Sequence, residues 1–321
     1  MRRDSLAGIY GSQRLREAAR VAFTTVDEEP IEVTKISRGN RKQTAIATFP
    51  TRGPVVVQLC AERTWLRTEA TLLREIRRRT FVPVPPVLAA GTHNGIAYML
   101  TAYVAGDDLH QRFTAVSEET RRDLARWFGK ALARLHEVFT FNSYGRLNPS
   151  DRGLTGGGRT WPNWVTEYGR QAIDRLPDPF DPIRDELHEL LGHIPATEPP
   201  ARLFPWDFRP GNALVVDGSI TAVLDWEAPL AAPPALSVAK CEYLVADWYV
   251  SDPDPLRRAF ESGYTAVRQY PSIHPSHRAV AIADSAVDSN GVVTNPGYPP
   301  VGREEAIQFH RVGLTELVGD S

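Results

Sequence analysis

Residues 205–227 read PWDFRPGNALVVDGSITAVLDWE and carry three side chains suited to binding a metal: Asp207, Asn212 and Asp225. Two apolar runs, ALVV and SITAVL, flank the dipeptide Asp217-Gly218. This dipeptide is strongly favoured in tight hairpin turns, because both positions tolerate a positive φ. We therefore predict a β-hairpin that begins near Asn212 and ends just before Asp225. Its paired strands would bring these two residues side by side.

The same three side chains suit phosphoryl transfer. A carboxylate and an amide oxygen are hard ligands for Mg²⁺, an ion that commonly binds substrate phosphates as well. Asp207 precedes the hairpin and could accept a hydrogen bond from a substrate hydroxyl, which would orient that hydroxyl for attack on phosphorus. The structural alternative is that Asp207 caps a turn, Asn212 closes a loop and Asp225 caps the next segment. An Asp followed five residues later by Asn is by itself a weak motif.

The composition indicates a globular protein of two lobes. The chain has 321 residues, 42% hydrophobic and 24% charged, which is longer than one typical domain. A formal net charge of -2 disfavours nucleic acid or an anionic membrane as a partner. No apolar run has the length of a signal-peptide core or a membrane span. The two cysteines, Cys60 and Cys241, lack the spacing of a zinc or redox site. We therefore expect a soluble cytoplasmic protein.

Local patterns predict a sheet lobe followed by a helical lobe. After a short amphipathic helix from about Ser12, four strands are expected around a helix of residues 62–79. The strands are expected at 31–37, 42–49, 54–60 and 95–103. Beyond residue 104 helical periodicity dominates, first over residues 124–135. The predicted fold class is α+β, with a small antiparallel-sheet lobe of residues 1–103 and a larger, mostly helical lobe of residues 104–321.

The helix of residues 62–79 carries a charge on its apolar face. Glu69 falls in the middle of a stripe formed by Trp65, Leu66, Leu72, Leu73 and Ile76. Burying a carboxylate is costly unless another group satisfies it. Glu69 is therefore predicted to have a partner.

This order of parts resembles protein-kinase-like folds: a strand, a helix glutamate, a DxxxxN loop, a hairpin and a second Asp. The second Asp is followed by Trp in LDWE, and this version resembles the aminoglycoside phosphotransferase and choline kinase superfamily. Supporting matches are SRGN, TEATLLREI, AYVAGDDL, LARLHE and FESGY. The resemblance implies a bilobal kinase-like fold and a kinase acting on small molecules, with ATP or GTP and Mg²⁺ as cofactors.

The resemblance also assigns catalytic and metal-binding roles. Asp207 matches the catalytic aspartate, and Asn212 and Asp225 match the two magnesium ligands. Glu69 matches the glutamate that forms an ion pair with a strand cation.

Nucleotide contacts are implied at three places. Gly39 and Asn40, a dipeptide that also signals a hairpin turn, are expected over the phosphates. The backbone from Ala102 to Val104 is expected to hydrogen-bond the purine. Gln58 occupies the strand position where the family has a cation, so it is expected to donate to a phosphate oxygen and to Glu69.

Three departures from the family pattern concern positioning. The catalytic loop opens Pro205-Trp206-Asp207 where the family has His-Gly-Asp, and the family histidine braces the metal-ligand segment. Gln58 lacks a full charge, so it should stabilise the transition state less. Aspartates that support the loop are replaced by Pro233 and Ser237.

Arg41, Lys42 and Arg209 are cations that could compensate for Gln58. For Arg41 and Lys42 a solvated surface position is the ordinary expectation.

The predicted function is transfer of the γ-phosphate of ATP or GTP to a hydroxyl of a small-molecule acceptor. The alternative is a catalytically weakened kinase-like protein that binds nucleotide or ligand as a sensor or scaffold. Protein kinase activity is less favoured, because no activation segment is evident. Six residues are candidates for the acceptor pocket, although aromatic residues in such places are more often core: Trp161, Trp164, Trp226, Glu227, Glu242 and Trp248. The acceptor, the choice between ATP and GTP, and the oligomeric state are left open by these residues.

Overall fold

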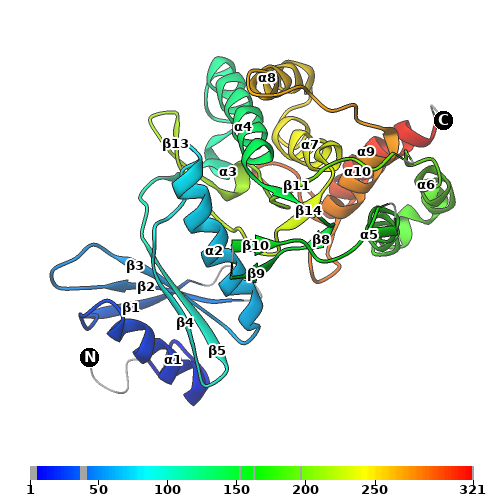
Figure 1. Ribbon diagram of the computed structural model, residues 1–321. Coiled ribbons are helices and arrows are strands. Elements are labelled where there is room, and N and C mark those ends of the chain that lie inside the picture. The colour runs from blue at the N-terminus through cyan, green and yellow to red at the C-terminus, as the bar shows by residue number, and fades with distance from the viewer. Residues whose placement is uncertain (1–5, 37–41, 152, 162, 196, 320–321) are drawn as a thin grey trace. The chain divides into compact units, whose positions relative to one another are not determined.

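The computed structural model describes residues 6–36, 42–151, 153–161, 163–195 and 197–319, and the chain divides into two units. The sheet unit comprises Met1–Gly106, Leu147–Leu154 and Thr221–Ala228. The helical unit comprises Asp107–Arg146, Thr155–Ile220 and Pro229–Ser321. In Figure 1 most of the sheet unit is coloured blue to cyan and most of the helical unit green to red.

The sheet unit is built on five antiparallel strands in the order β1-β2-β3-β5-β4. The strands are β1 (Glu32–Ile36), β2 (Gln43–Thr48), β3 (Val55–Cys60), β4 (Val87–His93) and β5 (Ile96–Ala102). Four of them lie within one or two residues of the predicted strands. The fifth, β4, was not predicted, because its residues are small and only weakly alternating. Asn94 and Gly95 adopt positive φ angles of 46° and 82° between β4 and β5, and this Asn-Gly pair was the available turn signal.

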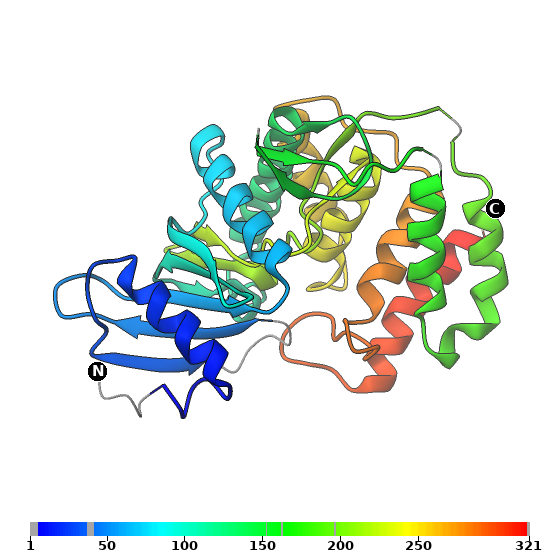
Figure 2. The same cartoon turned by 60° about the horizontal axis from the view of Figure 1, so that its bottom comes forward.

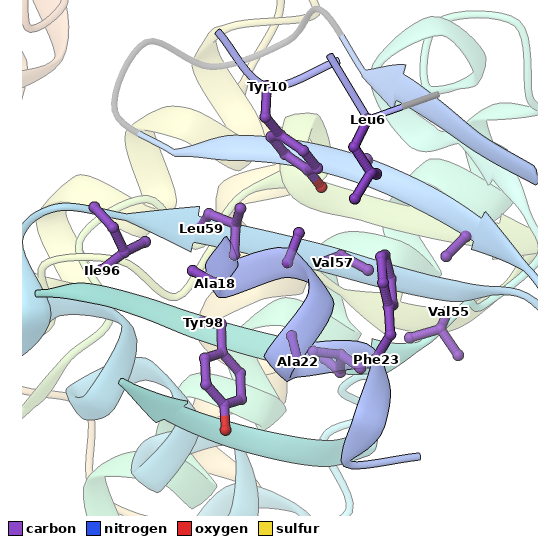
Figure 3. Close-up of a cluster of buried hydrophobic side chains, with 14 of the residues drawn as sticks. Leu6, Tyr10, Ala18, Ala22, Phe23, Val55, Val57, Leu59, Ile96 and Tyr98 are labelled. Carbon is purple, nitrogen blue, oxygen red and sulfur yellow. The ribbon is translucent and has the colours of Figure 1, made fainter. Parts of the chain in front are cut away.

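Helix α1 (Gln13–Thr24) packs on one face of this sheet, as Figures 2 and 3 show. The hydroxyl of Ser12 caps it by accepting a hydrogen bond from the Leu15 N–H. Alternate residues of β3, among them Val57 and Leu59, are buried in the same cluster as the helix. Because side chains alternate along a strand, Gln58 faces the opposite side of the sheet.

Helix α2 (Arg63–Arg79) contacts β3, β4 and β5. Its buried residues include Leu66, Leu72, Leu73 and Ile76, as the predicted stripe requires, together with Glu69. A two-stranded ribbon of β9 (Asn148–Ser150) and β10 (Gly153–Thr155) is also present, and β9 contacts α2.

The helical unit contains most of the helices of the chain. They are α3 (Leu109–Arg112), α4 (Glu118–Val138), α5 (Asn163–Asp174), α6 (Arg184–Leu191), α7 (Pro234–Glu242), α8 (Asp254–Thr265), α9 (Pro275–Ala286) and α10 (Arg303–Gly319). Short turns are η1 (Asp178–Ile183), η2 (Pro210–Asn212) and the π-turn η3 (Tyr243–Asp247). Helices α4 and α8 cross so closely that a Cβ added at Gly129 or Gly263 would lie within 2.0 Å of a backbone carbonyl oxygen on the other helix. Glycine at these two positions therefore permits the close approach. The predicted helical periodicity beyond residue 104 is therefore confirmed.

Two small sheets contain the strands on either side of the loop of residues 205–212. One has the order β7-β11-β14-β8, formed by β7 (Thr140–Phe141), β11 (Ala201–Phe204), β14 (Leu230–Ala232) and β8 (Gly145–Arg146). The other joins β12 (Ala213–Val216) to β6 (Asp107–Asp108) and to β13 (Ser219–Val223). Asp217 and Gly218 have φ angles of 49° and 74°, as a type I′ turn requires. The predicted hairpin is confirmed, and its second strand passes into the sheet unit at Thr221.

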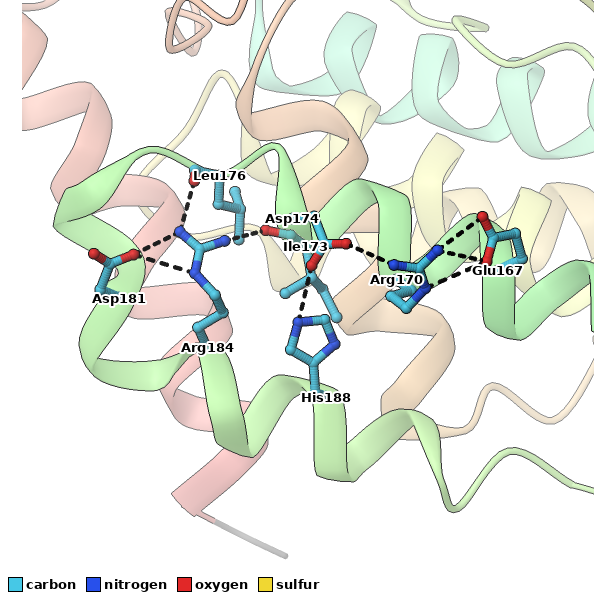
Figure 4. A network of polar contacts seen from close by, with 8 residues as sticks. All are labelled: Glu167, Arg170, Ile173, Asp174, Leu176, Asp181, Arg184 and His188. Atoms are coloured by element: carbon cyan, nitrogen blue, oxygen red, sulfur yellow. Dashed lines mark hydrogen bonds and ion pairs between the residues drawn. The ribbon is translucent and has the colours of Figure 1, made fainter.

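The outer helices of the helical unit are joined by polar contacts. Helices α5, α6, α9 and α10 contact one another in several pairs, and Figure 2 shows them side by side. Figure 4 shows ion pairs along α5 and α6, including Arg170 with Glu167 and Asp174, and His188 with Asp174. Such exposed pairs contribute little to stability.

Among the described residues, no helix combines the length and the apolar character needed to span a lipid bilayer.

Candidate functional site

A single buried lysine holds the acidic cluster of the sheet unit together. Lys42 directly precedes β2, and its Nζ lies 3.0 Å from Oε2 of Glu69. The same nitrogen lies 3.3 Å from Oδ1 of Asp225 and 3.3 Å from Oε2 of Glu227. The Lys42 side chain is only 9% exposed. The predicted partner of Glu69 therefore exists, and the expectation that Lys42 is a solvated surface cation is wrong.

The charges around Lys42 fix its protonation state. Burial alone would lower the pKa of Lys42, but the three carboxylates together raise this pKa above its usual value. The ammonium group is therefore charged at neutral pH. One positive charge faces three negative ones, and this excess of two negative charges suits the binding of a divalent cation.

Glu69 is paired with Lys42 and not with Gln58, whereas the predicted contact of Gln58 with a phosphate stays a prediction. Gln58 lies on β3 opposite Thr44 of β2, on the sheet face away from α1. Within the part of the chain that the structure describes, the Gln58 side chain forms no hydrogen bond or ion pair. The expected contact of Gln58 with Glu69 is therefore replaced by the contact of Lys42 with Glu69.

The loop of residues 205–212 in the helical unit is organised around Asp207. The Asn212 side-chain amide donates hydrogen bonds to the backbone oxygen and to Oδ2 of Asp207, both at 2.9 Å. Arg209 forms an ion pair with the other carboxylate oxygen, with Nε at 2.7 Å from Oδ1. Because the Asn212 nitrogen is used in this way, its side-chain oxygen is the atom that can bind a cation.

Trp206 stands where the family has a glycine and adopts a left-handed conformation with φ of 62°. A non-glycine residue in this region is strained unless its surroundings hold it. The indole N–H donates a hydrogen bond to Oδ2 of Asp284 at 2.8 Å, and the Lys240 ammonium lies 4.5 Å from the centre of the indole ring. These contacts hold the residue that directly precedes Asp207.

Asp284 is the centre of a buried polar cluster that was not predicted. Besides Trp206, it contacts Lys240 through an ion pair, Tyr168 through a hydrogen bond of 2.6 Å and Arg175 through an ion pair of 2.6 Å. Burial opposes the ionisation of Asp284, but Lys240 and the other partners hold the pKa of this carboxyl below its ordinary value. The cluster therefore holds Trp206, the residue before Asp207, through charged and hydrogen-bonded contacts.

Ser237 replaces an expected aspartate and still makes a polar contact. Its hydroxyl lies 3.1 Å from Nε2 of His136 on α4, and Nδ1 of the same ring lies 2.8 Å from the hydroxyl of Tyr264. Burial lowers the pKa of His136 to about 3. A neutral histidine needs only neutral partners, so a serine can satisfy it where an aspartate is missing.

The segment predicted to contact the purine ends strand β5. The N–H groups of Ala102 and Tyr103 donate to the carbonyl oxygens of Pro86 and Pro54. Those two donors are therefore engaged within the sheet unit, and Val104 follows in an exposed segment. Gly39, Asn40 and Arg41 lie outside the described residues.

The six residues predicted as candidates for the acceptor pocket lie in different surroundings. Trp161 and Trp164 pack against Tyr144 as core residues, Trp226 is buried and donates its indole N–H to the Val223 carbonyl, and Glu242 is buried against Arg278 and Tyr270. Glu227 belongs to the Lys42 cluster. Only Trp248 of the six lines a cleft of the helical unit described below.

A cleft of about 870 Å³ opens between η3 and α10 in the helical unit. Its walls combine aromatic rings and carboxylates, among them Tyr243, Trp248, Phe309, Asp247, Glu305 and Glu316. Burial raises the pKa of Asp247 to about 6, although Arg257 opposes this shift. Arg209 lies 4.9 Å from the centre of the Trp248 ring, so this cleft wall is linked through Arg209 to Asp207.

The residues present fit a nucleotide and Mg²⁺. No three His, Cys, Asp or Glu side chains gather as a metal site in the described part of the chain. A Mg²⁺ ion bound through one or two protein oxygens, phosphates and water needs no such group. Asn212 and Asp207 belong to the helical unit and Asp225 to the sheet unit, so a metal shared by Asn212 and Asp225 stays a prediction.

A sequence model of the phosphotransferase enzyme family matches residues 32–275. No protein of curated function matches the sequence significantly.

The structure is similar to several solved kinase-like proteins. A thermostable mutant of aminoglycoside phosphotransferase APH(4)-Ia, in a ternary complex with AMP-PNP and hygromycin B, matches with a TM-score of 0.63 at 16% identity, over 97% of this chain and 99% of that one. A putative fructosamine-3-kinase from Haemophilus somnus 129PT matches with a TM-score of 0.61 at 13% identity, over 95% and 99%. The GDP complex of aminoglycoside 2'-phosphotransferase-IIIa matches with a TM-score of 0.62 at 12% identity, over 95% and 99%. The predicted protein-kinase-like fold is confirmed.

Proposed function

Because this chain belongs to the phosphotransferase enzyme family, we propose that it transfers the γ-phosphate of ATP or GTP to a hydroxyl group of a small molecule. The observation that carries this proposal is the arrangement around Asp207. Its carboxylate is held on one side by Asn212 and on the other by Arg209. A carboxylate fixed in this way is pre-positioned to orient an acceptor hydroxyl.

In the proposed reaction Asp207 accepts the proton of the acceptor hydroxyl. The acceptor oxygen forms a bond to the γ-phosphorus, the bond from that phosphorus to the bridging oxygen breaks, and the nucleoside diphosphate leaves with the electron pair. Asn212 and Asp225 would each offer an oxygen to a Mg²⁺ ion, which would neutralise phosphate charge. Catalysis of this kind depends mainly on positioning and electrostatics.

The nucleotide is proposed to lie against the face of the five-stranded sheet that points away from α1. Val104 supplies a backbone N–H for the purine, because the N–H groups of Ala102 and Tyr103 are already engaged. Support for a nucleotide comes from the similar structures, of which one contains AMP-PNP and another GDP. Gly39 and Asn40 are proposed to cover the phosphates.

The acceptor is proposed to be an amine-bearing polyol that enters the cleft beside Trp248. The aromatic walls offer flat surfaces for a sugar ring, and three carboxylates, Asp247, Glu305 and Glu316, against the one cation Arg257 that pairs with Asp247, leave the walls with an excess of negative charge. Among the similar structures, one contains hygromycin B and another is a putative fructosamine-3-kinase.

The test is nucleoside triphosphate consumption with Mg²⁺ across a panel of amino-sugars and small alcohols. We expect turnover by the wild type and its loss in both Asp207→Asn and Asp225→Ala, with Glu119→Gln on the exposed start of α4 as a matched control that retains activity. Turnover that survives in Asp207→Asn would contradict the proposal. Binding of nucleotide with no turnover on any acceptor would instead favour the sensor or scaffold.

The bracing contacts favour an enzyme over the sensor. Each departure from the family pattern has a replacement contact: Lys42 for the strand cation, Asp284 for the loop histidine and Ser237 for the aspartate. A protein that only binds nucleotide does not need Asp284 to hold Trp206, the residue before Asp207, in place.

A further inference from the structure

Lys42 lies where a phosphate-binding cation is needed but comes from an unexpected place in the sequence. The resemblance placed this cation on β3, at Gln58, and that position is an uncharged amide. Lys42 directly precedes β2 and lies two residues before Thr44, which pairs with Gln58 across the two strands. Both Thr44 and Gln58 face the side of the sheet away from α1.

The contacts of Lys42 are those of a buried functional cation. Its ammonium contacts Glu69 at 3.0 Å and Asp225 and Glu227 at 3.3 Å each, with the side chain 9% exposed. Lysine side chains are mostly exposed in proteins and are rarely buried to this extent unless they are paired. A lysine held by more than one carboxylate also stays charged, as a phosphate ligand must.

Glu69 provides the second line of support. It lies in the middle of α2 and is itself buried, so without Lys42 it would be a buried charge without a counter-ion. The described part of the chain offers it no other ion pair. The position of Lys42 is therefore fixed by a residue of the neighbouring helix and not by chance packing.

We propose that Lys42 takes over the role of the missing strand cation and binds the phosphates of the nucleotide, with Glu69 as its positioning residue. This inference rests on the proposed function, since it names the phosphate contact of the same site. When a triphosphate is bound, the Lys42 ammonium contacts its phosphate oxygens and keeps Glu69 as its fixed partner. Asp225 and Glu227 are then released for the cation.

The proposal predicts that the cation can be moved back to β3. In a Lys42→Met, Gln58→Lys double variant, the new lysine lies on the same sheet face and within one strand of the original position. It should restore a charged contact with Glu69 and with phosphate. If the side chain at position 42 only filled space, a lysine introduced at position 58 on β3 would not restore the nucleotide binding lost in Lys42→Met.

The experiment measures MgATP and MgGTP affinity by calorimetry and, separately, turnover with the best acceptor. Four proteins are compared: wild type, Lys42→Met, the double variant and Lys35→Met, the last removing an exposed lysine on the neighbouring strand β1. We expect Lys42→Met to bind nucleotide at least about tenfold more weakly and to turn over about 10²-fold to 10³-fold more slowly, with partial recovery of both in the double variant. Lys35→Met should match wild type.

Thermal unfolding separates a binding defect from a folding defect. Lys42→Arg keeps a positive charge beside Glu69 and should retain the fold, so it serves as the second variant if Lys42→Met unfolds. Nucleotide affinity unchanged in a folded Lys42→Met protein, or no recovery of affinity in a folded double variant, would overturn the inference.

The two proposals fail in different ways. Wild type that binds MgATP through Lys42 but transfers no phosphate would support the inference about Lys42 and contradict the proposed function. Turnover that is unchanged in Lys42→Met would support the proposed function and contradict the inference about Lys42. Wild type that binds neither MgATP nor MgGTP would sink both.

Discussion

The indole N–H of Trp206 donates a hydrogen bond of 2.8 Å to Oδ2 of Asp284, 78 residues further along the chain. Trp206 directly precedes Asp207 and has a left-handed backbone. The contact joins the loop that contains Asp207 to helix α9, so that the position of the Asp207 carboxylate depends on a buried charge cluster of the helical unit.

Trp206→Phe tests this brace directly. The change removes the N–H donor but keeps an aromatic ring beside Lys240, so we expect the free energy of unfolding to fall by about 1–2 kcal/mol. Because Asp207 would lose its support, kcat should fall by about tenfold or more while nucleotide affinity stays unchanged. Urea unfolding and steady-state kinetics measure the two effects.

Arg175→Gln is the control for the brace. It also removes a contact with Asp284, an ion pair of 2.6 Å, but from the residue that follows α5. A similar loss of stability with kcat close to that of wild type is expected. If the two variants lower kcat equally, the Trp206 contact has no special part in positioning Asp207.

Acid stability should depend on His136. Its pKa is about 3 in the folded chain because of burial, against about 6.5 when unfolded. As the pH falls below about 6.5, the unfolded chain takes up the proton and the folded chain does not, so the free energy of unfolding falls by about 1.4 kcal/mol per pH unit until about pH 3. His136→Gln should flatten this slope by that amount.

The measurement for His136 is urea unfolding between pH 4 and pH 7. Exposed His193→Gln is the matched control and should keep the wild-type slope. An identical slope in wild type and His136→Gln would show that the buried ring does not titrate as its burial requires.

Recognition of an amine-bearing acceptor should depend on pH through Asp247. Burial raises the pKa of this carboxyl to about 6, so it is neutral below and ionised above that pH. The KM for an amine-bearing acceptor should therefore fall as the pH rises through about 6. In Asp247→Asn the KM should be higher by about tenfold to a hundredfold at pH 7.5 and lack this step.

Two comparisons isolate the Asp247 effect. An acceptor with hydroxyl groups but no amine should show no such dependence, and Glu261→Gln removes an exposed carboxylate of α8 outside the cleft. If Asp247→Asn keeps the wild-type pH profile for the amine-bearing acceptor, the cleft beside Trp248 does not bind the amine.

The features that the sequence predicts correctly are local. The turn at Asp217 and Gly218, the amphipathic stripe of α2 and the burial of Glu69 each follow from a few neighbouring residues. Turn chemistry and periodicity act within one element, so they can be read without knowledge of tertiary packing. Strand β4 is the exception, because its small residues alternate too weakly.

The features that the sequence did not predict depend on long-range packing. Lys42 pairs with Glu69 only because of how β2 and α2 lie in the sheet unit, and a residue beside an apparent turn is normally solvated. Asp284 reaches Trp206 from α9, and nothing in its own segment marks it as a partner. The resemblance marks Gln58 and Pro205 as positions without the family's cation and histidine, but the contacts of Lys42 and Asp284 appear only in the tertiary structure.

The most direct test of the proposed phosphotransferase is mass-spectrometric detection of phosphorylated acceptor. Wild type and Asp207→Asn are incubated with MgATP or MgGTP and an amino-sugar panel, after calorimetry has shown that both proteins bind nucleotide. We predict a phosphorylated product with wild type and a fall of at least about 10³-fold in its rate of formation with Asp207→Asn. Nucleotide binding by both proteins, with equal product from each or with no product from wild type on any acceptor, would contradict the proposed phosphotransferase function.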